Sequence, residues 1–366
     1  MIKKVRLVTG IILFSFLSCH LINLSFGLVS LTALDDSREW FLIFWSTPPG
    51  IALLVGSMMT HLSLGMFALY QRNTLRMKLS DQVQLVLGLL IFPLVFGHLL
   101  VTVLGPMMGG MRQSYFSILT LFWVLDPISG LKQVVVTMVA WIHGCMGLVI
   151  WMRIQSWWSR VAGFVYPFVV AIPLLALLGM VEAGKEVIEL NKDPDYTDLA
   201  RDTLIPSDRF YDNIITILNI ALTLYFVTLV IVLIARYIRV RKDSGRLSVT
   251  FTDGTRFDVT TGLTLLEISR MHNKPHASLC GGKARCGTCR VRIHEGSEIL
   301  PEASSFERKT LKRVNAEPDT RLACQVIPRS GAITIEPLIP FYIEPKDLRS
   351  TGVADTDAEP AAGSAK

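Results

Sequence analysis

Four cysteines near the C-terminal end of the chain have the residue type and the spacing of a metal-cluster site. Three of them follow the pattern C-x5-C-x2-C and the fourth comes 34 residues later; they are Cys280, Cys286, Cys289 and Cys324. A tight loop that supplies three thiolates, with a distant segment that supplies the fourth, is how cysteines hold a cluster of two irons. The spacing therefore predicts a [2Fe–2S] cluster bound by these four residues.

The residues within the loop favour this interpretation over the other uses of grouped cysteines. Gly281, Gly282 and Gly287 allow the backbone to wrap closely and to direct N–H groups at the sulfurs. Structural zinc is typically held by two C-x2-C pairs, and this segment has one. Disulfides are rare in the cytoplasm, where the charge pattern places this segment. Cys19 and Cys145 lie in apolar segments and are interpreted as small packing residues.

Four histidines form a second group of candidate ligands, in the apolar part of the chain. His20, His61, His98 and His143 occur once in each of the first four long apolar segments, and no other histidine occurs before residue 240. A polar side chain inside a bilayer costs free energy and usually has a function there. Two neutral imidazoles on one haem iron leave no open position, which suits electron transfer.

The depths of the histidines along their helices divide them into two pairs. At a rise of 1.5 Å per residue, His20 and His98 lie about 20–25 Å from the cytoplasmic ends of their helices, and His61 and His143 about 13–16 Å from theirs. The first and third helices of a four-helix bundle are diagonal, as are the second and fourth. The depths therefore predict two b haems, an outer one held by His20 and His98 and an inner one held by His61 and His143. A proton relay, a transported-metal site and structural hydrogen bonds remain as alternatives.

The composition identifies the part of the chain that carries these histidines as a membrane anchor. The 366 residues are 51% hydrophobic and 18% charged, and the mean hydropathy of +0.45 is too apolar for an ordinary soluble protein. The segment 106–132 is expected to contain an extra helix at the outer interface. Apolar segments close to the ~20 residues that cross a bilayer occur at about 7–31, 50–70, 83–105, 133–152, 161–181 and 211–236.

The distribution of positive charge predicts the orientation of these six helices. Lys and Arg are concentrated at the N-terminus, after the second and fourth segments, and at the end of the sixth. All of these positions fall on one side if all six segments cross, and the opposite loops are acidic, above all the loop at 182–212. Because positive charge is retained in the cytoplasm, the N-terminus and the cluster domain are expected there. The predicted location is a membrane, with the lipid bilayer as one partner, and the resemblance given below implies that this is a bacterial inner membrane.

Around the cysteines, the sequence has the pattern of a soluble α+β domain. Alternation on either side of Asp253-Gly254 predicts a hairpin. This pattern predicts strands at Leu247–Phe251, Arg256–Val259, Arg290–Ile293 and Ala332–Pro337, and helices at Leu263–His272 and 303–314. The predicted fold class is therefore an all-α six-helix transmembrane bundle followed by an α+β domain of the β-grasp, 2Fe–2S ferredoxin-like type.

The chain is predicted to divide into four parts. They are a membrane anchor at 1–238, a linker at 239–245, the ferredoxin-type domain at 246–345 and a disordered tail at 346–366. Between Ser244 and Pro345 there are 14 Lys and Arg and 11 Asp and Glu. A domain of net positive charge is expected to act on its own membrane part or to meet an acidic partner. No nucleic-acid partner is expected, and no flavin or nicotinamide pattern is found, so the electron donor or acceptor must be external.

Several short segments of the anchor resemble a known group of proteins. They are Leu28-Val-Ser-Leu, Pro48-Pro49-Gly50, His61-Leu-Ser-Leu, Asn73-Thr-Leu-Arg-Met77, Leu87-Gly-Leu-Leu-Ile-Phe-Pro93 and Trp141-Ile-His-Gly-Cys145. Together they resemble the six-helix anchor of certain bacterial class III adenylate cyclases. That anchor is similar to the dihaem cytochrome b subunits of succinate dehydrogenase and fumarate reductase. In some of those cyclases a [2Fe–2S] ferredoxin domain follows the sixth helix and precedes the cyclase domain.

The resemblance covers about residues 1–345 and implies the same ligands for the cluster and the haems. It does not carry over cyclase activity, because only about 20 residues follow Pro345. The leading hypothesis is a membrane-bound protein that transfers electrons between a cytoplasmic [2Fe–2S] cluster and membrane haems b, with quinone or a redox protein as partner. One alternative is a redox-sensing module, as a homodimer, that acts on a separate cyclase or other effector. Another is a membrane-tethered ferredoxin without haem.

Overall fold

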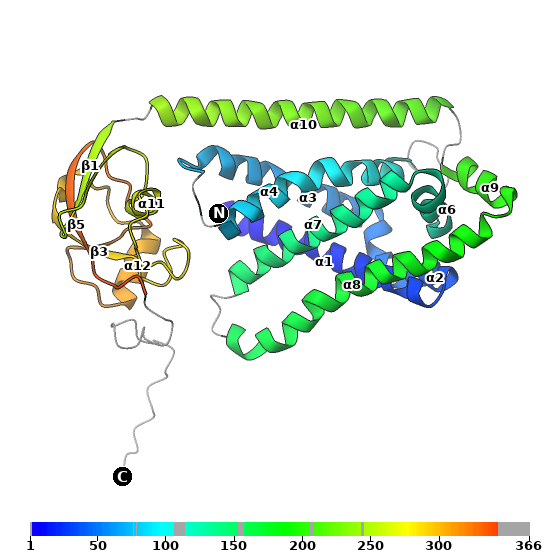
Figure 1. Cartoon of the computed structure of the whole chain (residues 1–366), viewed down its shortest axis with the longest axis horizontal. Helices are drawn as coiled ribbons and strands as arrows, with labels where there is room; N and C mark the ends of the chain where they lie inside the picture. The colour runs from blue at the N-terminus through cyan, green and yellow to red at the C-terminus, as the bar shows by residue number, and fades with distance from the viewer. Residues whose placement is uncertain are drawn as a thin grey trace, which may run out of the picture. The chain divides into compact units, whose positions relative to one another are not determined.

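The computed structural model describes residues 2–75, 77, 79–105, 114–152, 157–204, 208–242 and 245–342. Their contacts divide the chain into two units. The first unit, Met1–Tyr70 with Ser80–Leu233, is built of helices, and the second, Gln71–Leu79 with Ile234–Lys366, contains the sheet (Figure 1). The predicted tail at 346–366 lies outside the described residues.

Six helices are long and apolar enough to cross a membrane. They are α1 (Ile2–Ser25), α3 (Pro48–Gln71), α4 (Leu79–Leu99), α7 (Pro127–Met152), α8 (Trp158–Leu190) and α10 (Asp208–Lys242). They coincide with the six apolar segments of the sequence, so the prediction of six long apolar helices is confirmed. The helices α8 and α10 extend beyond the predicted limits, because a hydropathy pattern does not detect polar residues that continue a helix at its end.

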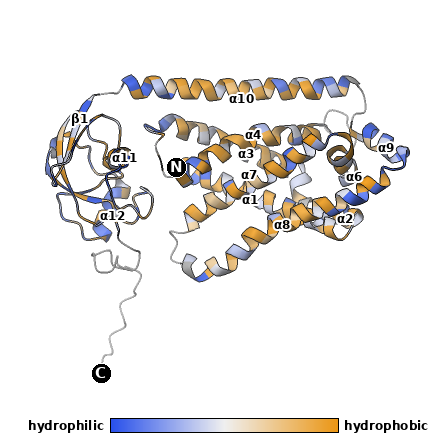
Figure 2. Ribbon diagram, viewed as in Figure 1, coloured by the Kyte–Doolittle hydropathy of each residue, from blue (hydrophilic) through white to orange (hydrophobic). Residues whose placement is uncertain are grey.

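These long helices carry apolar side chains on their outer surfaces. Phe164 and Phe168 on α8 and Leu224 on α10 are exposed, and Figure 2 shows hydrophobic residues along the length of the long helices. A helix on the surface of a soluble protein instead exposes a polar face and buries an apolar stripe. Helices with apolar outer faces are solvated by lipid, because their backbone hydrogen bonds are satisfied internally. The first unit therefore has the character of a multi-pass membrane body.

Shorter helices lie in the connections between the long ones. They are α2 (Leu31–Leu42), α6 (Tyr115–Thr120) and α9 (Pro194–Leu204), with 3-10 turns η1 (Phe26–Leu28) and η2 (Phe44–Ser46) and a π-helical turn η4 (Leu121–Leu125). The first apolar segment therefore ends at Leu28, short of the predicted residue 31. Ser30 then caps α2 by accepting a hydrogen bond from the Ala33 N–H. A helix is present within 106–132, as predicted, from Tyr115 onward.

The second unit contains a five-stranded mixed sheet with the strand order β2-β1-β5-β3-β4 (Figure 1). The strands are β1 (Arg246–Phe251), β2 (Arg256–Thr260), β3 (Arg290–Glu295), β4 (Thr320–Leu322) and β5 (Gly331–Pro337). Val249 pairs with Ile333 where β1 runs parallel to β5, and the other strand pairs are antiparallel. All four predicted strands are present, and the last lies beside the first. The ferredoxin-like fold class is confirmed.

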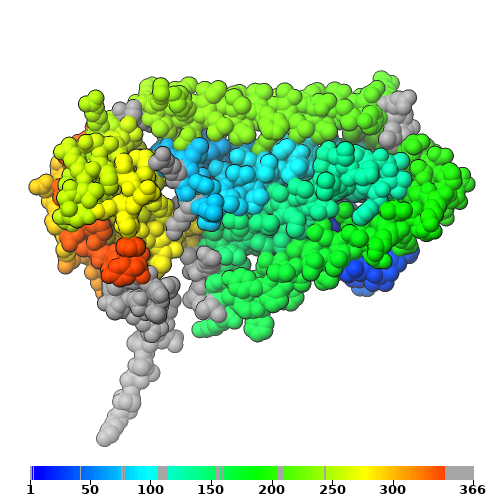
Figure 3. Space-filling model, viewed as in Figure 1, coloured from blue at the N-terminus to red at the C-terminus, as the bar shows by residue number. Residues whose placement is uncertain are grey.

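Two helices complete this domain, α11 (Leu265–Met271) and α12 (Ser305–Arg313), with a 3-10 turn η5 (Ser297–Ile299) between β3 and α12. α11 begins at a capping box in which Thr264 and Glu267 exchange hydrogen bonds. Figure 3 shows the domain, in yellow to orange, as a closely packed body. Its core includes Leu247, Val249, Phe251, Leu265, Leu266, Ile268, Val291, Leu322, Ile333 and Ile335.

The linker predicted at 239–245 is helical over its first part. α10 continues to Lys242, and β1 begins at Arg246. The basic residues in the last turn of α10 favour this extension, because positive side chains interact well with the carbonyl end of a helix.

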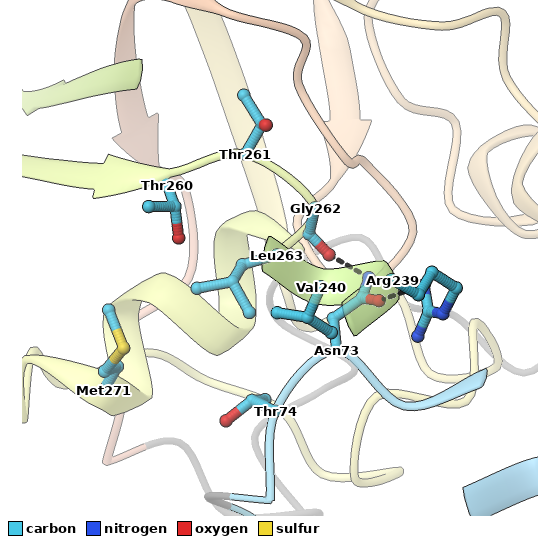
Figure 4. Close-up of a pocket in the computed structure, with 9 residues that line it drawn as sticks. All are labelled: Asn73, Thr74, Arg239, Val240, Thr260, Thr261, Gly262, Leu263 and Met271. Carbon is cyan, nitrogen blue, oxygen red and sulfur yellow. Dashed lines mark hydrogen bonds between the residues drawn. The ribbon is translucent and has the colours of Figure 1, made fainter. Parts of the chain in front are cut away.

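The second unit also includes the loop that follows α3, which is held by two arginines of α10. Arg236 donates to the carbonyl oxygens of Arg72 and Asn73 at 2.8 and 3.0 Å. Arg239 donates to the Asn73 side chain at 2.9 Å, and the Asn73 amide donates to the Gly262 carbonyl oxygen (Figure 4). Several of these residues line a cavity of about 210 Å³. None of the predicted ligands lines this cavity.

Candidate functional site

The cysteine loop, residues 279–289, lies between α11 and β3, and Cys324 lies two residues after the end of β4. Its backbone turns repeatedly through conformations with positive φ, which glycine adopts readily and other residues rarely. The residues with positive φ are Gly281 (70°), Gly282 (92°), Ala284 (56°) and Gly287 (73°). The three predicted glycines therefore have the conformational role expected of them, and they coil the loop so that its cysteines gather near Cys324.

The four cysteines meet as two pairs. The Cys280 and Cys286 sulfurs interact through a hydrogen bond, and so do the Cys289 and Cys324 sulfurs. All six cysteines of the chain are described, and none of them forms a disulfide. Among the described residues, no three His, Cys, Asp or Glu side chains converge on one metal position. Two pairs of cysteines match a cluster of two irons, which is held by four thiolates.

Hydrogen-bond donors of the loop point at the sulfurs of the first pair. The Cys280 N–H donates to the Cys286 sulfur and the Lys283 N–H donates to the Cys280 sulfur, both at 3.4 Å. The Thr288 hydroxyl lies 3.0 Å from the Cys286 sulfur. Within each pair the thiol that donates has a raised pKa and the sulfur that accepts has a lowered one: the pKa is raised for Cys286 and Cys289 and lowered for Cys280 and Cys324. The N–H donors of the loop favour the thiolate, which is the metal-binding form of cysteine.

The second pair is buried, and α12 holds the loop that contains it. Cys289 is 1% exposed and Cys324 is 7% exposed. The Thr310 hydroxyl on α12 donates to the Ala284 carbonyl oxygen at 2.5 Å. This contact fixes the loop between the first and second cysteines at Ala284, whose positive φ is unfavourable for a residue other than glycine.

A buried carboxylate fixes α12 to the strand that precedes the fourth cysteine. Glu307 is 1% exposed, and it accepts hydrogen bonds from Arg321 at 2.9 and 3.1 Å and from the Leu322 N–H at 2.9 Å. Leu322 lies two residues before Cys324. Sequence reasoning missed both Glu307 and Thr310, because polar residues in a polar helix carry no signal that distinguishes a buried contact from a solvated one.

The first unit brings the four predicted histidines together as two pairs. In the outer pair, His20 on α1 and His98 on α4 have ring centroids 6.2 Å apart. In the inner pair, His61 on α3 and His143 on α7 have ring centroids 6.3 Å apart. Imidazole nitrogen binds a metal at about 2.0–2.1 Å, so two rings on opposite sides of one metal have centroids about 6 Å apart. Both pairs have this spacing, and they are the pairs that the depths along the helices predict.

The inner pair has the surroundings of metal-binding histidines. Nδ1 of His143 lies 3.1 Å from the Gln84 carbonyl oxygen, and Nδ1 of His61 lies 3.2 Å from the Thr9 hydroxyl. A metal-binding histidine characteristically donates its other ring N–H to such an oxygen, which fixes the ring and its tautomer. With Nδ1 engaged, Nε2 is the nitrogen available to a metal. A Cβ at Gly88 would lie 2.7 Å from His143 Cε1, so this ring occupies space that only a glycine leaves open.

The outer pair is held differently. The π-helical turn η3 (Leu100–Leu104) follows shortly after His98, and Thr102 donates to the His98 carbonyl oxygen at 2.8 Å. The Phe16 ring stacks on the His20 ring, with centroids 5.8 Å apart. Within the described residues, the buried Nδ1 of His20 has no hydrogen-bond partner. Packing and a helix distortion of a kind frequent at functional sites therefore position this pair.

The hydrogen-bond partners of the two inner histidines were not identified from the sequence. Thr9 lies on α1 and Gln84 on α4, 52 and 59 positions from the histidines that they contact. The signal that points to Thr9 is its polarity within an apolar segment, because polar residues at such positions usually interact inside the helix bundle. Gln84 meets the His143 ring through its backbone carbonyl oxygen, and the sequence carries no signal for that contact.

The two remaining cysteines lie outside both sites. Cys145 packs against the buried side chains of Leu21, Trp141 and Ala176. Cys19 is half-buried on α1. The contacts of Cys145 are those of the packing residue that the sequence predicts.

Residues 250–329 match the model of the 2Fe-2S iron-sulfur cluster binding domain family, and this range includes all four paired cysteines. The chain is 33% identical over 91 residues to a 2Fe-2S ferredoxin of Haemophilus influenzae, a match that covers 25% of this chain and 79% of that ferredoxin. The chain belongs to the 2Fe-2S ferredoxin family. A [2Fe–2S] cluster is therefore the cofactor of this domain, and one-electron transfer is its chemistry.

Two further similarities concern the same family. The chain is 33% identical over 95 residues to one component of the Na(+)-translocating NADH-quinone reductase of Chlamydia caviae, a match that covers 26% of this chain and 21% of that component. An ISC-like [2Fe-2S] ferredoxin of Pseudomonas putida, known from its crystal structure, is 30% identical with a TM-score of 0.24. That match covers 27% of this chain and 94% of the ferredoxin.

Proposed function

We propose that this ferredoxin-family protein transfers electrons between its [2Fe–2S] cluster and two b haems in its membrane unit. The observation that carries the proposal is the pairing of four histidines from four long apolar helices, at ring separations of 6.2 and 6.3 Å. A ferredoxin domain needs no such helices to carry electrons in solution. Helices that merely tether a domain to the membrane would also not need four half-buried imidazoles in two matched pairs.

In this proposal Cys280, Cys286, Cys289 and Cys324 are the cluster ligands. Their arrangement as two pairs and the N–H donors around Cys280 fit the cluster. When bound, the cluster accepts or releases one electron at a time. The donors stabilise negative charge on the sulfurs, and the burial of the second pair excludes water from it. Both effects tune the reduction potential of such a site.

The inner and the outer pair of histidines are proposed to hold one haem each. A haem with two imidazole ligands exchanges electrons without an open position for a substrate. Thr9 and Gln84 fix the inner rings in the orientation that ligation needs, and Gly88 leaves room for one of them. For the outer pair, the spacing of the rings is the feature that fits the haem.

We also propose a location in the bacterial inner membrane, with the N-terminus and the ferredoxin domain in the cytoplasm. The last turn of α10, which leads into β1, carries Arg239, Arg241 and Lys242. Positive residues at a helix end are typical of the cytoplasmic side. Since the sequence has no flavin or nicotinamide pattern, a separate donor or acceptor is required. The similarity to a component of a quinone reductase supports quinone as one such partner.

The test is a cofactor analysis of the full-length protein, purified in detergent. Absorbance spectra are recorded before and after reduction with dithionite, and haem and non-haem iron are quantified per chain. Two b haems and two non-haem irons are the expected result. Non-haem iron without haem would overturn the haem assignment and leave a membrane-tethered ferredoxin. Haem without non-haem iron would contradict the cluster ligands proposed here.

A further inference from the structure

Positive charge is concentrated around the cysteine loop of the ferredoxin domain. The cysteine loop and residues 303–314, which include α12, together contain six Lys and Arg and one Asp or Glu. The remainder of 246–342 contains eight Lys and Arg and nine Asp and Glu. The single acid, Glu307, is buried against Arg321. Five of the six basic residues are exposed, and we call them the basic face: Lys283, Arg285, Arg308, Lys309 and Lys312.

Direct contacts join the two segments that form the basic face. Thr310 on α12 donates to the Ala284 carbonyl oxygen at 2.5 Å, and Arg313 donates to the Arg285 carbonyl oxygen. The side chains of the face therefore stand on two elements that are fixed to each other. Phe306, in the first turn of α12, is 70% exposed and adds a large apolar side chain beside them. Exposed aromatic and basic residues together are typical of protein docking sites.

The basic face lies where the cluster site is nearest to the surface. Cys280 and Cys286 are half-buried, whereas Cys289 and Cys324 are buried in the core of the domain. The first pair brackets Lys283 and Arg285 in the sequence, and both of these side chains are exposed. A redox partner that comes close to the cluster must therefore approach over this positive loop.

Elsewhere in the domain, positive charge is balanced locally. Arg292 on β3 lies 2.6 Å from Glu317, 3.1 Å from Asp319 and 3.7 Å from Glu336. These exposed carboxylates cancel its field over a short distance. The excess of positive charge is thus a local property of the surface around the cluster and not of the domain as a whole.

We propose that the basic face is the docking site of a separate, acidic redox protein that exchanges one electron with the cluster. This inference rests on the electron-transfer function proposed above. Complementary charge accelerates the encounter of two proteins and fixes their orientation. In each encounter one electron passes, so the donor is oxidised and the acceptor is reduced, with no bond made or broken and no proton transferred.

Two other occupants of the face fit less well. The last turn of α10, which we assign to the cytoplasm, is itself basic and so lacks the complementary charge that would hold the face in a lasting contact. An anionic lipid surface has the complementary charge. A lipid headgroup seated on the cysteine loop would, however, cover the route between the half-buried cysteines and any soluble partner.

The experiment uses the full-length protein in nanodiscs of neutral lipid, with the cluster reduced by dithionite and excess reductant removed. Stopped-flow absorbance follows the reduction of ferric cytochrome c, either native and basic or succinylated and acidic. At low ionic strength, the double variant Lys309→Glu with Lys312→Glu should reduce the succinylated form about tenfold more slowly than the wild type. With the native form the same variant should be faster, and both differences should shrink with added salt.

A matched control is Arg246→Glu with Arg256→Glu, which makes the same change in net charge on the exposed side of β1 and β2. The two double variants are compared at 0.1 M salt, where screening limits charge effects to about 10 Å, and this control should then keep the rates of the wild type within about twofold. Equal effects of the two double variants would overturn the proposed docking site. So would loss of the preference for succinylated cytochrome c in nanodiscs of anionic lipid, because lipid would then occupy the face.

The electron paramagnetic resonance signal of the reduced cluster, measured in every variant, separates this inference from the proposed function. An intact signal without any charge preference would contradict the docking site alone. A wild-type protein without the signal would contradict the cluster assignment, on which the proposed function rests.

Discussion

The two candidate cofactor sites of this chain are built in opposite ways. The cysteine loop places three of four ligands within ten residues, and backbone turns at glycines bring them together. The histidine pairs draw on four helices, and successive histidines are 41, 37 and 45 positions apart in the sequence. A site encoded in one short segment is detectable by family comparison, as the match over residues 250–329 shows. A site assembled from distant helices has no such local signature.

The two sites also differ in what holds their ligands. In the first cysteine pair, the donors to sulfur are N–H groups of the cysteine loop itself. In the inner histidine pair, the ring nitrogens meet Thr9 and Gln84 on other helices. Substitutions in the cysteine loop are therefore expected to abolish the cluster. Substitutions of residues that join the helices are expected to weaken haem binding by amounts that differ from one residue to another.

The largest effect is expected from Cys286→Ser. A hydroxyl is a poor ligand for iron compared with a thiolate, so the variant should lose the electron paramagnetic resonance signal of the reduced cluster. Haem absorbance should remain, because the histidine pairs belong to the other unit. Cys145→Ser, at a packing position within the membrane unit, is the control and should keep both signals. A normal cluster signal in Cys286→Ser would contradict the assignment of this ligand.

Replacement of His61 by Ala is expected to remove the inner haem alone. The haem content per chain should fall from two to one, measured as the haemochrome in pyridine, because the inner haem would lose one of the two imidazoles proposed to hold it. The control is His294→Ala, since this histidine is exposed on β3 and pairs with Glu336. Unchanged haem content in the His61 variant would rule out the inner haem.

A third variant, Glu307→Ala, tests whether the cluster domain depends on its own buried contacts. Removal of this carboxylate leaves Arg321 without its partner, and loss of one member of a buried ion pair costs about 3–5 kcal/mol. Unfolding in urea, followed by the visible absorbance of the cluster, should show this loss in the free energy of unfolding. Glu302→Ala, at an exposed position just before α12, should change it by less than about 0.5 kcal/mol. Equal stability of the two variants would show that the Glu307–Arg321 contact contributes little.

The smallest effect is expected from Gly88→Ala. The added methyl group would lie 2.7 Å from His143 Cε1, so the ring must move, and such overpacking costs about 1–3 kcal/mol. Weaker retention of the inner haem during titration with a competing haem-binding protein would report this shift. Gly56→Ala is the matched control, because a methyl group there meets nothing within 4 Å among the described residues. If the two variants retain haem equally, the His143 ring does not depend on the space that Gly88 leaves for it.

Local patterns in the sequence predict most elements of the fold. Four of the five strands and both helices of the ferredoxin domain follow from alternation and turn residues. The fifth strand, Thr320–Leu322, is too short to show alternation. The break between α1 and α2 is also missed, because the chain stays apolar across it and only the Ser30 cap marks the new helix. The helical start of the expected linker, as far as Lys242, is missed because its charged residues resemble a solvated connection.

The sequence by itself determined the cluster type, the six apolar helices and which histidines pair by depth. The first two depend on residue types and their spacing along the chain, and the third depends on a comparison of depths among four apolar segments. Only the tertiary structure decided that Thr310 and Glu307 fix the cluster loop and β4, and that Thr9 and Gln84 face the inner histidines. Such contacts join residues that are far apart in the chain. Their distances are set by how whole elements pack, and no pattern within a single segment contains that information.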